Sequence, residues 1–125
     1  MRKTLFLILF LSLALSACAS ADQPAQSVEN YYQAILDGDA ERATALSCAE
    51  QEANVQMEID SFLAVDATLD NFSCEQIGTD GDMALVSCTG KIVMSYDGED
   101  QYLDLSVATY QVLEQGGDWL FCGYH

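Results

Sequence analysis

The sequence SVENYYQAILDGD, residues 27–39, decides the fold of this chain. Its apolar residues recur at spacings of three and four, which places them on one face of a helix: Val28, Tyr31, Tyr32, Ile35 and Leu36. The pattern predicts a helix that starts at Ser27 and stops at Gly38, since glycine commonly follows the last helical turn.

The residues after Gly38 predict two further helices. Asp39 caps a short second helix, and Ser47 with Glu50 fits a capping box that opens a third. Four apolar residues of the third helix are expected to point inward: Val55, Ile59, Phe62 and Leu63. Its opposite face is polar and carries Glu50, Glu52, Glu58 and Asp60.

From Thr68 onward the hydrophobic period changes from 3.6 to 2, which is typical of strands. We expect four strands, separated by glycine-rich turns, at residues 72–77, 83–96, 101–114 and 118–124. Helices followed by an antiparallel meander predict an α+β fold, with the helices packed on one face of a four-stranded sheet.

The order of these segments resembles that of nuclear transport factor 2-like domains of the cystatin-like superfamily. The resemblance rests on Val28–Ile35, on the Asp37-Gly38-Asp39 break, on Leu46-Ser47-Cys48 and on the ending Gly117–Gly123. It covers most of residues 26–124, within the single domain that the length of the chain predicts over residues 27–125. It implies a cone-shaped, curved sheet around the helices and a pocket in its concave face. It implies no activity, because such folds serve isomerases, cyclases, dehydratases and binding modules alike.

The first 17 residues have the pattern of a signal peptide, with two cations followed by an apolar run from Leu5 to Leu15. Leu15-Ser16-Ala17-Cys18 resembles the lipobox of bacterial lipoproteins. This implies cleavage before Cys18, diacylglycerol on its sulfur, and a protein anchored on the extracytoplasmic face of a membrane. That membrane is the outer one if the source has one, and otherwise the cell membrane. Residues 18–26 are the lipidated cysteine and a spacer. The alternative is an ordinary secretory signal with an incidental cysteine.

The charge of the chain is strongly negative. Cleavage of the first 17 residues would change the net charge from −16 to −18, because it removes two cations and leaves twenty acids with only Arg42 and Lys91. Binding to nucleic acid is excluded, since it requires cations that displace counterions. The acid excess has three explanations: solubility, adaptation to salt, or a surface for cations or a basic partner.

Four cysteines remain for the folded domain: Cys48, Cys74, Cys88 and Cys122. An even number in an exported chain predicts two disulfides. Cys74 and Cys88 lie symmetrically about Gly81 and would oppose each other across a hairpin, which leaves Cys48 for Cys122. A redox role is the alternative, but it requires a stabilised thiolate. With one histidine and no C-x-x-C pair, we expect no metal and no cofactor.

The last strand suggests an interaction face. If Cys122 reaches Cys48, the face of this strand that carries Cys122 meets the helices. Trp119 and Phe121 then lie on the outer surface of the sheet. Tyr102 and Tyr110 would join them there. Either the edge of the sheet curls over these aromatics, or they form a face for a partner or a homodimer.

The expected function is a non-catalytic, lipid-anchored module that binds a small apolar ligand or a protein partner. The alternative is an isomerase, cyclase or dehydratase with an inward Asp/Tyr pair acting on a hydrophobic substrate. No catalytic residue can be assigned. A cavity lined by a carboxylate of raised pKa would favour the enzyme, whereas a core filled by Tyr31, Phe62 and Trp119 would disfavour it.

Overall fold

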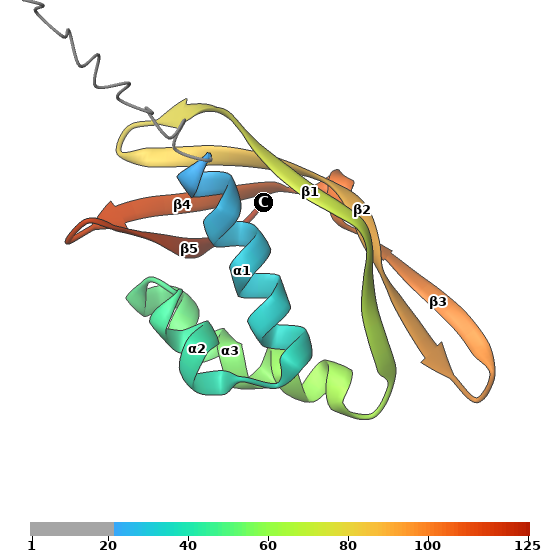
Figure 1. Ribbon diagram of the computed structural model, residues 1–125. Coiled ribbons are helices and arrows are strands. Elements are labelled where there is room, and N and C mark those ends of the chain that lie inside the picture. The colour runs from blue at the N-terminus through green and yellow to red at the C-terminus, as the bar shows by residue number, and fades with distance from the viewer. Residues whose placement is uncertain (1–21) are drawn as a thin grey trace, which may run out of the picture.

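The computed structural model describes residues 22–125, which form three α-helices followed by five antiparallel strands (Figure 1). The elements are α1 Gln23–Asp37, α2 Ala40–Ala45, α3 Ala49–Leu63, β1 Asp66–Asp80, β2 Met83–Tyr96, β3 Glu99–Asp104, a 3₁₀ turn Leu105–Val107, β4 Thr109–Gln115 and β5 Asp118–Tyr124. The predicted α+β layout is confirmed. The predicted signal peptide and Cys18 lie outside the described residues. Within residues 22–125, no helix is long and apolar enough to cross a membrane.

Helix α1 begins four residues earlier than predicted. Asp22 is its N-cap and accepts a hydrogen bond on Oδ1 from the Ala25 N–H at 3.3 Å. Pro24 lies in the first turn, where its missing N–H costs no hydrogen bond. Residues 23–26 are therefore helical and not spacer. Ser27 does not cap the helix, because its hydroxyl donates to the Trp119 carbonyl on β5 at 2.8 Å.

The start of α3 also differs from the prediction. Ser47 forms no capping box, because its hydroxyl donates instead to a backbone carbonyl of α2 at 2.7 Å. Cys48 is the N-cap, and its side chain makes no capping hydrogen bond. Val55 and Ile59 are buried as predicted, whereas Leu63 at the end of the helix is 69% exposed.

The predicted strand over residues 101–114 is two strands. Asp104 ends β3, and its Oδ1 accepts hydrogen bonds from the Ser106 N–H and hydroxyl at 2.9 and 2.6 Å. These bonds stabilise a 3₁₀ turn that buries Leu105. The sheet order is β1-β2-β4-β5, and β3 pairs with the second half of the long strand β2. The sheet therefore has five strands instead of four.

The sheet bends around the helices at a β-bulge in β1 (Figure 1). The pairing of β1 with β2 shifts between Asp70 and Ser73, where Asn71 has a φ of 51°. Gly90 lies opposite on β2 with a φ of 92°. A bulge adds a residue to one strand and so increases the local bend and twist. This bend produces the concave face that α1 covers.

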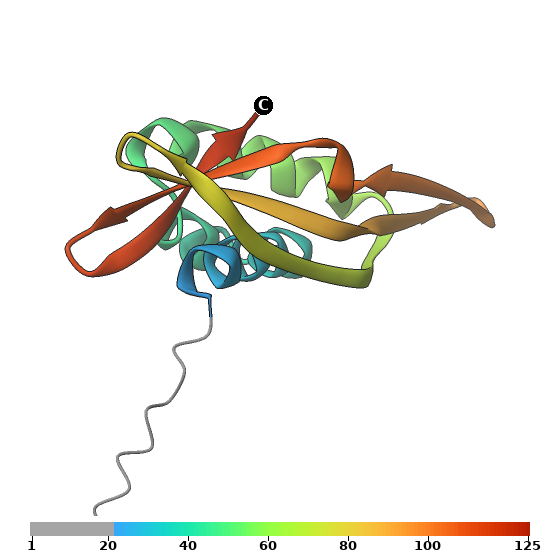
Figure 2. The same ribbon diagram turned by 90° about the horizontal axis from the view of Figure 1, so that it is seen from above.

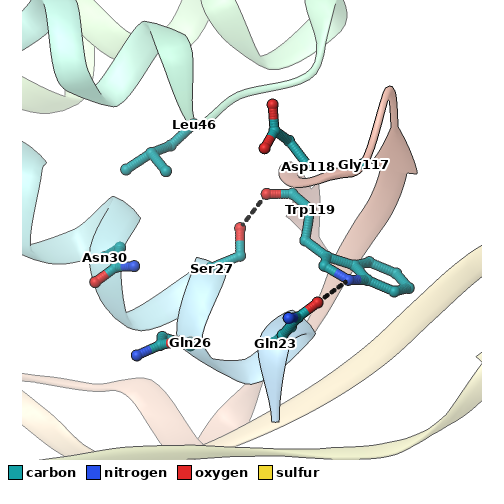
Figure 3. A pocket seen from close by; sticks show the side chains of 8 residues that line it. All are labelled: Gln23, Gln26, Ser27, Asn30, Leu46, Gly117, Asp118 and Trp119. Carbon is teal, nitrogen blue, oxygen red and sulfur yellow. Dashed lines mark hydrogen bonds between the residues drawn. The ribbon is translucent and has the colours of Figure 1, made fainter. Parts of the chain in front are cut away.

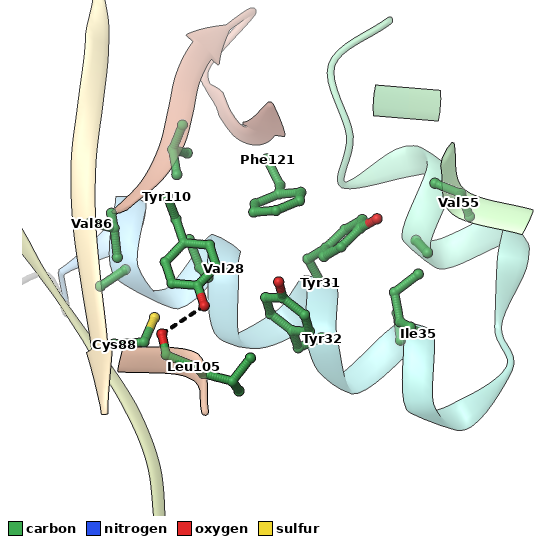
Figure 4. Close-up of a cluster of buried hydrophobic side chains, with 14 of the residues drawn as sticks. Val28, Tyr31, Tyr32, Ile35, Val55, Val86, Cys88, Leu105, Tyr110 and Phe121 are labelled. Atoms are coloured by element: carbon green, nitrogen blue, oxygen red, sulfur yellow. Dashed lines mark hydrogen bonds between the residues drawn. The ribbon is translucent and has the colours of Figure 1, made fainter. Parts of the chain in front are cut away.

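Aromatic side chains fill the space between α1 and the sheet (Figure 4). The rings of Tyr31 and Phe121 stack with their centroids 4.0 Å apart. Tyr32 makes an edge-to-face contact with Tyr110 at 5.8 Å. Tyr31, Tyr110 and Phe121 are at most 1% exposed. The pocket that the resemblance placed in the concave face is occupied by these rings.

Both predicted disulfides are present. Cys74 and Cys88 are directly opposed on β1 and β2, with their Cα atoms 4.0 Å apart. Cys48 joins Cys122, with the Cα atoms 5.2 Å apart. The segment before α3 lies alongside β5, because the Cys48 N–H donates to the Phe121 carbonyl at 2.9 Å. The Cys48–Cys122 bridge therefore ties α3 to the edge of the sheet.

Candidate functional site

The four aromatics of the predicted interaction face do not share one surface. Phe121 and Tyr110 are fully buried, Trp119 is half-buried, and only Tyr102 is exposed. The prediction assumed that Cys122 reaches Cys48 across the concave face. Because Cys48 approaches β5 from the side, Cys122 can point away from the core while Phe121 points into it. The predicted face is wrong for this reason.

Trp119 joins β5 to the first turn of α1 (Figure 3). Its indole Nε1 donates to Gln23 Oε1 at 3.1 Å, and its carbonyl accepts from Ser27 at 2.8 Å. A hollow of about 230 Å³ lies beside it, lined by Gln23, Gln26, Ser27, Asn30, Leu46, Gly117, Asp118 and Trp119. In Figure 3 the indole is directed toward Gln23 and not across the hollow. The indole N–H and the backbone carbonyl of Trp119 thus both have structural partners.

Tyr102 lies on the β2–β3 hairpin, which extends beyond the helices in Figure 2. Lys91 Nζ lies 4.2 Å from the centre of the Tyr102 ring. The same amine is 3.8 Å from Asp70 Oδ2. These contacts are solvent-exposed, so each contributes at most about 1 kcal/mol to stability.

A larger hollow, of about 540 Å³, lies between α3 and the strands β4 and β5. We call it the Glu58 hollow, and it is lined by Gln51, Asn54, Met57, Glu58, Gln111, Cys122, Gly123 and Tyr124. No residue of this lining was predicted to form a site, although the Cys122 disulfide was predicted. Most of the lining residues carry amide, carboxylate or phenol groups.

Three side chains form a hydrogen-bonded cluster at this hollow. The Tyr31 hydroxyl donates to Glu58 Oε2 at 3.0 Å. Gln51 Nε2 donates to Glu58 Oε1 at 3.0 Å and to the Tyr31 hydroxyl oxygen at 2.9 Å. Asn54 donates to Gln51 Oε1 at 3.3 Å, which orients the Gln51 amide nitrogen toward Glu58. The cluster links α1 to α3.

The Glu58 carboxylate is perturbed by its surroundings. Burial raises its pKa above the ordinary range, and the hydrogen bonds from Tyr31 and Gln51 partly offset this effect. Burial also raises the pKa of Tyr31, so that its hydroxyl stays protonated and remains a donor. Within residues 22–125 the arginine and lysine side chains are Arg42 and Lys91, and each is paired elsewhere, with Asp37 and Asp70.

The sequence placed Glu58 on the polar face of α3, where a solvated carboxylate is the usual result. The spacing of Gln51 and Glu58, seven residues apart on one helix face, was the one available signal. Within residues 22–125, no three histidine, cysteine or acidic residues are grouped so as to hold a metal ion. The enzymatic alternative required a Tyr/Asp pair, and the tyrosine that does lie beside an acid, Tyr31, pairs with a glutamate.

Comparison with known proteins finds solved structures of similar fold but no match to a family model or to a curated protein. The designed protein Rd1NTF2_05, in a version with five substitutions, aligns with a TM-score of 0.56 at 10% identity, over 80% of this chain and 94% of its own. RPA3114 of Rhodopseudomonas palustris, which contains a SEC-C motif, also gives 0.56, at 12% identity over 84% and 80% of the two chains.

A third neighbour is a protein of Xanthomonas campestris described as a calcium/calmodulin dependent protein kinase II association domain. It aligns with a TM-score of 0.53 at 13% identity, over 78% of this chain and 79% of its own. Identities this low carry information about the fold and none about activity. The chain therefore has a nuclear transport factor 2-like fold.

Proposed function

We propose that this protein is a lipid-anchored, extracytoplasmic binding module, and not an enzyme, that holds a small polar ligand in the Glu58 hollow. The observation that carries this proposal is the stack of Tyr31 on Phe121, which occupies the concave face. A hydrophobic substrate inside the cone would have to displace these rings from a close-packed core. The hollow beside α3, of about 540 Å³, offers more space to a ligand than the hollow of about 230 Å³ beside Trp119.

The lining of the hollow favours a polar ligand over the apolar one expected from sequence. Gln111 and Asn54 bring amide groups, Tyr124 brings a phenol, and Glu58 brings a carboxylate. Small-molecule sites use a few such groups to fix the orientation of a ligand. The volume, about 540 Å³, falls within the range of known ligand pockets.

A protein that acts on its ligand is the second candidate. A buried carboxylate of raised pKa beside a tyrosine is an arrangement that enzymes use for proton transfer. Each oxygen of Glu58 already accepts a hydrogen bond from a neighbouring side chain. Those bonds offset only part of the effect of burial, so the pKa of Glu58 stays raised, which is the condition that favours an enzyme. Binding is preferred because the stacked rings of Tyr31 and Phe121 occupy the place that a hydrophobic substrate would take in the concave face.

The membrane anchor in this proposal is supported by the lipobox-like sequence at Cys18. We expect fatty-acid labelling and detergent partitioning of the wild-type protein, and loss of both in Cys18→Ala. Ser20→Ala, two residues away, is the matched control and should behave as wild type. Unchanged partitioning of Cys18→Ala would contradict the anchor.

Ligand binding is tested with the full-length protein in detergent. Thermal unfolding is measured in the presence of cationic, neutral and anionic polar compounds of similar size. A bound compound raises the unfolding temperature, and substitution of Gln111 or Tyr124 should abolish the shift. A panel in which no compound binds at the hollow would contradict the binding function, as would Glu58-dependent conversion of a compound.

A further inference from the structure

The Glu58 hollow holds a partly buried carboxylate with no cation beside it. Glu58 is surrounded by neutral donors, Gln51 and Tyr31. Arg42 pairs with Asp37 outside the hollow, and Lys91 pairs with Asp70 on the sheet. Removing a carboxylate from water is unfavourable unless an opposite charge or enough hydrogen bonds compensate for it. The protein itself supplies only part of this compensation.

The carboxylate also keeps unused acceptor capacity. A carboxylate offers about four lone-pair positions, and the two described hydrogen bonds occupy one position on each oxygen. Glu58 lines the hollow, so a ligand there can approach the remaining positions. An ammonium group, which is a donor with a full positive charge, matches both the free lone pairs and the missing charge.

We infer that the Glu58 hollow binds a small organic cation carrying an ammonium group, an inference that rests on the proposed binding function.

Other features of the lining favour the same ligand. Tyr124 is 60% exposed at the hollow and offers an aromatic ring to a cation. No lysine or arginine is among the lining residues, so an anionic ligand would meet Glu58 without compensation. The net charge of −16 raises the local concentration of cations and disfavours anions.

An organic cation fits this site better than a metal ion. Calcium requires six to eight oxygen ligands, and magnesium requires a near-octahedral set. Glu58 is the one carboxylate among the lining residues, and the amides of Gln51 and Asn54 are engaged with each other. The volume of the hollow, about 540 Å³, is far larger than a bare ion needs.

The test compares a cation with its neutral isostere. Butylammonium and 1-butanol have nearly the same shape and differ in charge, whereas choline, a cation without an N–H donor, and the anion butyrate extend the series. Binding to the full-length protein in detergent is measured by calorimetry, and the location by NMR shifts of Gln111 and Tyr124. We expect butylammonium to bind about tenfold or more tightly than 1-butanol.

Two pairs of variants locate the charge that is recognised. Glu58→Gln should weaken cation binding about tenfold or more, whereas Glu52→Gln, on the exposed face of α3, should have no effect. Gln111→Lys places a positive charge in the lining and should abolish cation binding. Its control, Gln115→Lys, puts the same charge at the exposed end of β4. The lysine variants keep the test valid if Glu58→Gln does not fold.

Each remaining outcome has a defined meaning. Equal affinity for butylammonium and 1-butanol would overturn the inference that the hollow binds an organic cation and would leave the binding function standing. If Glu58→Gln and Glu52→Gln weaken cation binding equally, the cation is attracted by the negative surface as a whole and not by Glu58. This result would also overturn the inferred cation site. If no cationic, neutral or anionic compound binds, the proposed function fails together with this inference.

Discussion

Gly90 on β2 lies directly against the backbone of Asn71 on β1. A Cβ atom at Gly90 would be 2.5 Å from the Asn71 carbonyl oxygen, where a real one is essentially never found. Gly90 also has a φ of 92°, which side-chain-bearing residues rarely adopt. The bulge that bends the sheet thus depends on the absence of a side chain on the opposite strand.

Gly90→Ala should therefore destabilise the protein, by about 2–4 kcal/mol, through backbone strain and the displaced bulge. Gly78→Ala is the matched control, since a Cβ there would meet nothing within 4 Å. Urea denaturation of both variants measures the difference. Equal stability of the two variants would mean that the bulge tolerates a side chain at Gly90.

Phe121→Ala should cost about 3–5 kcal/mol, because it removes the ring that stacks on Tyr31 and leaves a cavity in the core. Tyr124→Ala, three residues later on the same strand, removes a largely exposed ring and should change stability by less than about 1 kcal/mol. Thermal or urea unfolding checks this. Similar small losses at both positions would restore the outer-surface placement of Phe121.

The two disulfides should differ in their contribution to stability. Cys48–Cys122 closes a loop of 74 residues, and Cys74–Cys88 closes one of 14. On the loop-entropy model, removal by paired Cys→Ser substitution costs about 4–5 kcal/mol for the long loop and about 3 kcal/mol for the short one. Denaturation under oxidising conditions gives both values. A larger loss for the short loop would contradict this order.

Glu58→Gln should make the protein more stable near neutral pH. The pKa of Glu58 is raised in the folded state, so folding takes up a proton and stability falls as pH rises through that pKa. Glutamine carries no charge and avoids this loss. The titratable groups around Glu58 are Tyr31, which donates to it, and Tyr32, both from α1, and Tyr124 from β5 across the hollow.

The gain from Glu58→Gln should shrink toward zero as the pH falls to about 3, well below the ordinary glutamate pKa, where Glu58 is mostly protonated in the folded and unfolded states alike. Urea denaturation of wild type and variant at several pH values measures it. Glu52→Gln, which alters an exposed acid of the same helix, should show no such trend. If the stability gain of Glu58→Gln stays constant with pH, it arises from packing and not from the removed charge.

The sequence predicted the Cys74–Cys88 pair correctly, although the turn between these residues differs from the expected one. Symmetry about Gly81 assumed a three-residue loop, but Asp80 pairs with Met83 across a two-residue loop. A bulge between Gln76 and Gly78 then shifts the register by one residue. The hairpin and its disulfide were predictable from local pattern, whereas the compensating bulge was not.

The orientation of β5 and the burial of Glu58 could not be predicted, because both depend on tertiary contacts. Period 2 fixes that Phe121 and Cys122 point to opposite faces, but not which face meets the helices. That depends on Cys48 lying beside β5, which no local pattern indicates. Similarly, the helical period of α3 places Glu58 on a polar face, and only the approach of Tyr31 buries it.

Asp22 has a consequence for how the proposed anchor holds the domain. Its two carboxyl oxygens bind the Ala25 N–H in α1 and the Gln76 N–H in β1, the latter at 2.6 Å. The folded body therefore begins only four residues after Cys18, a distance that an extended chain spans in about 14 Å. An acylated molecule would stay within a thin layer above the lipid headgroups, and would meet its ligands there rather than sampling the wider compartment.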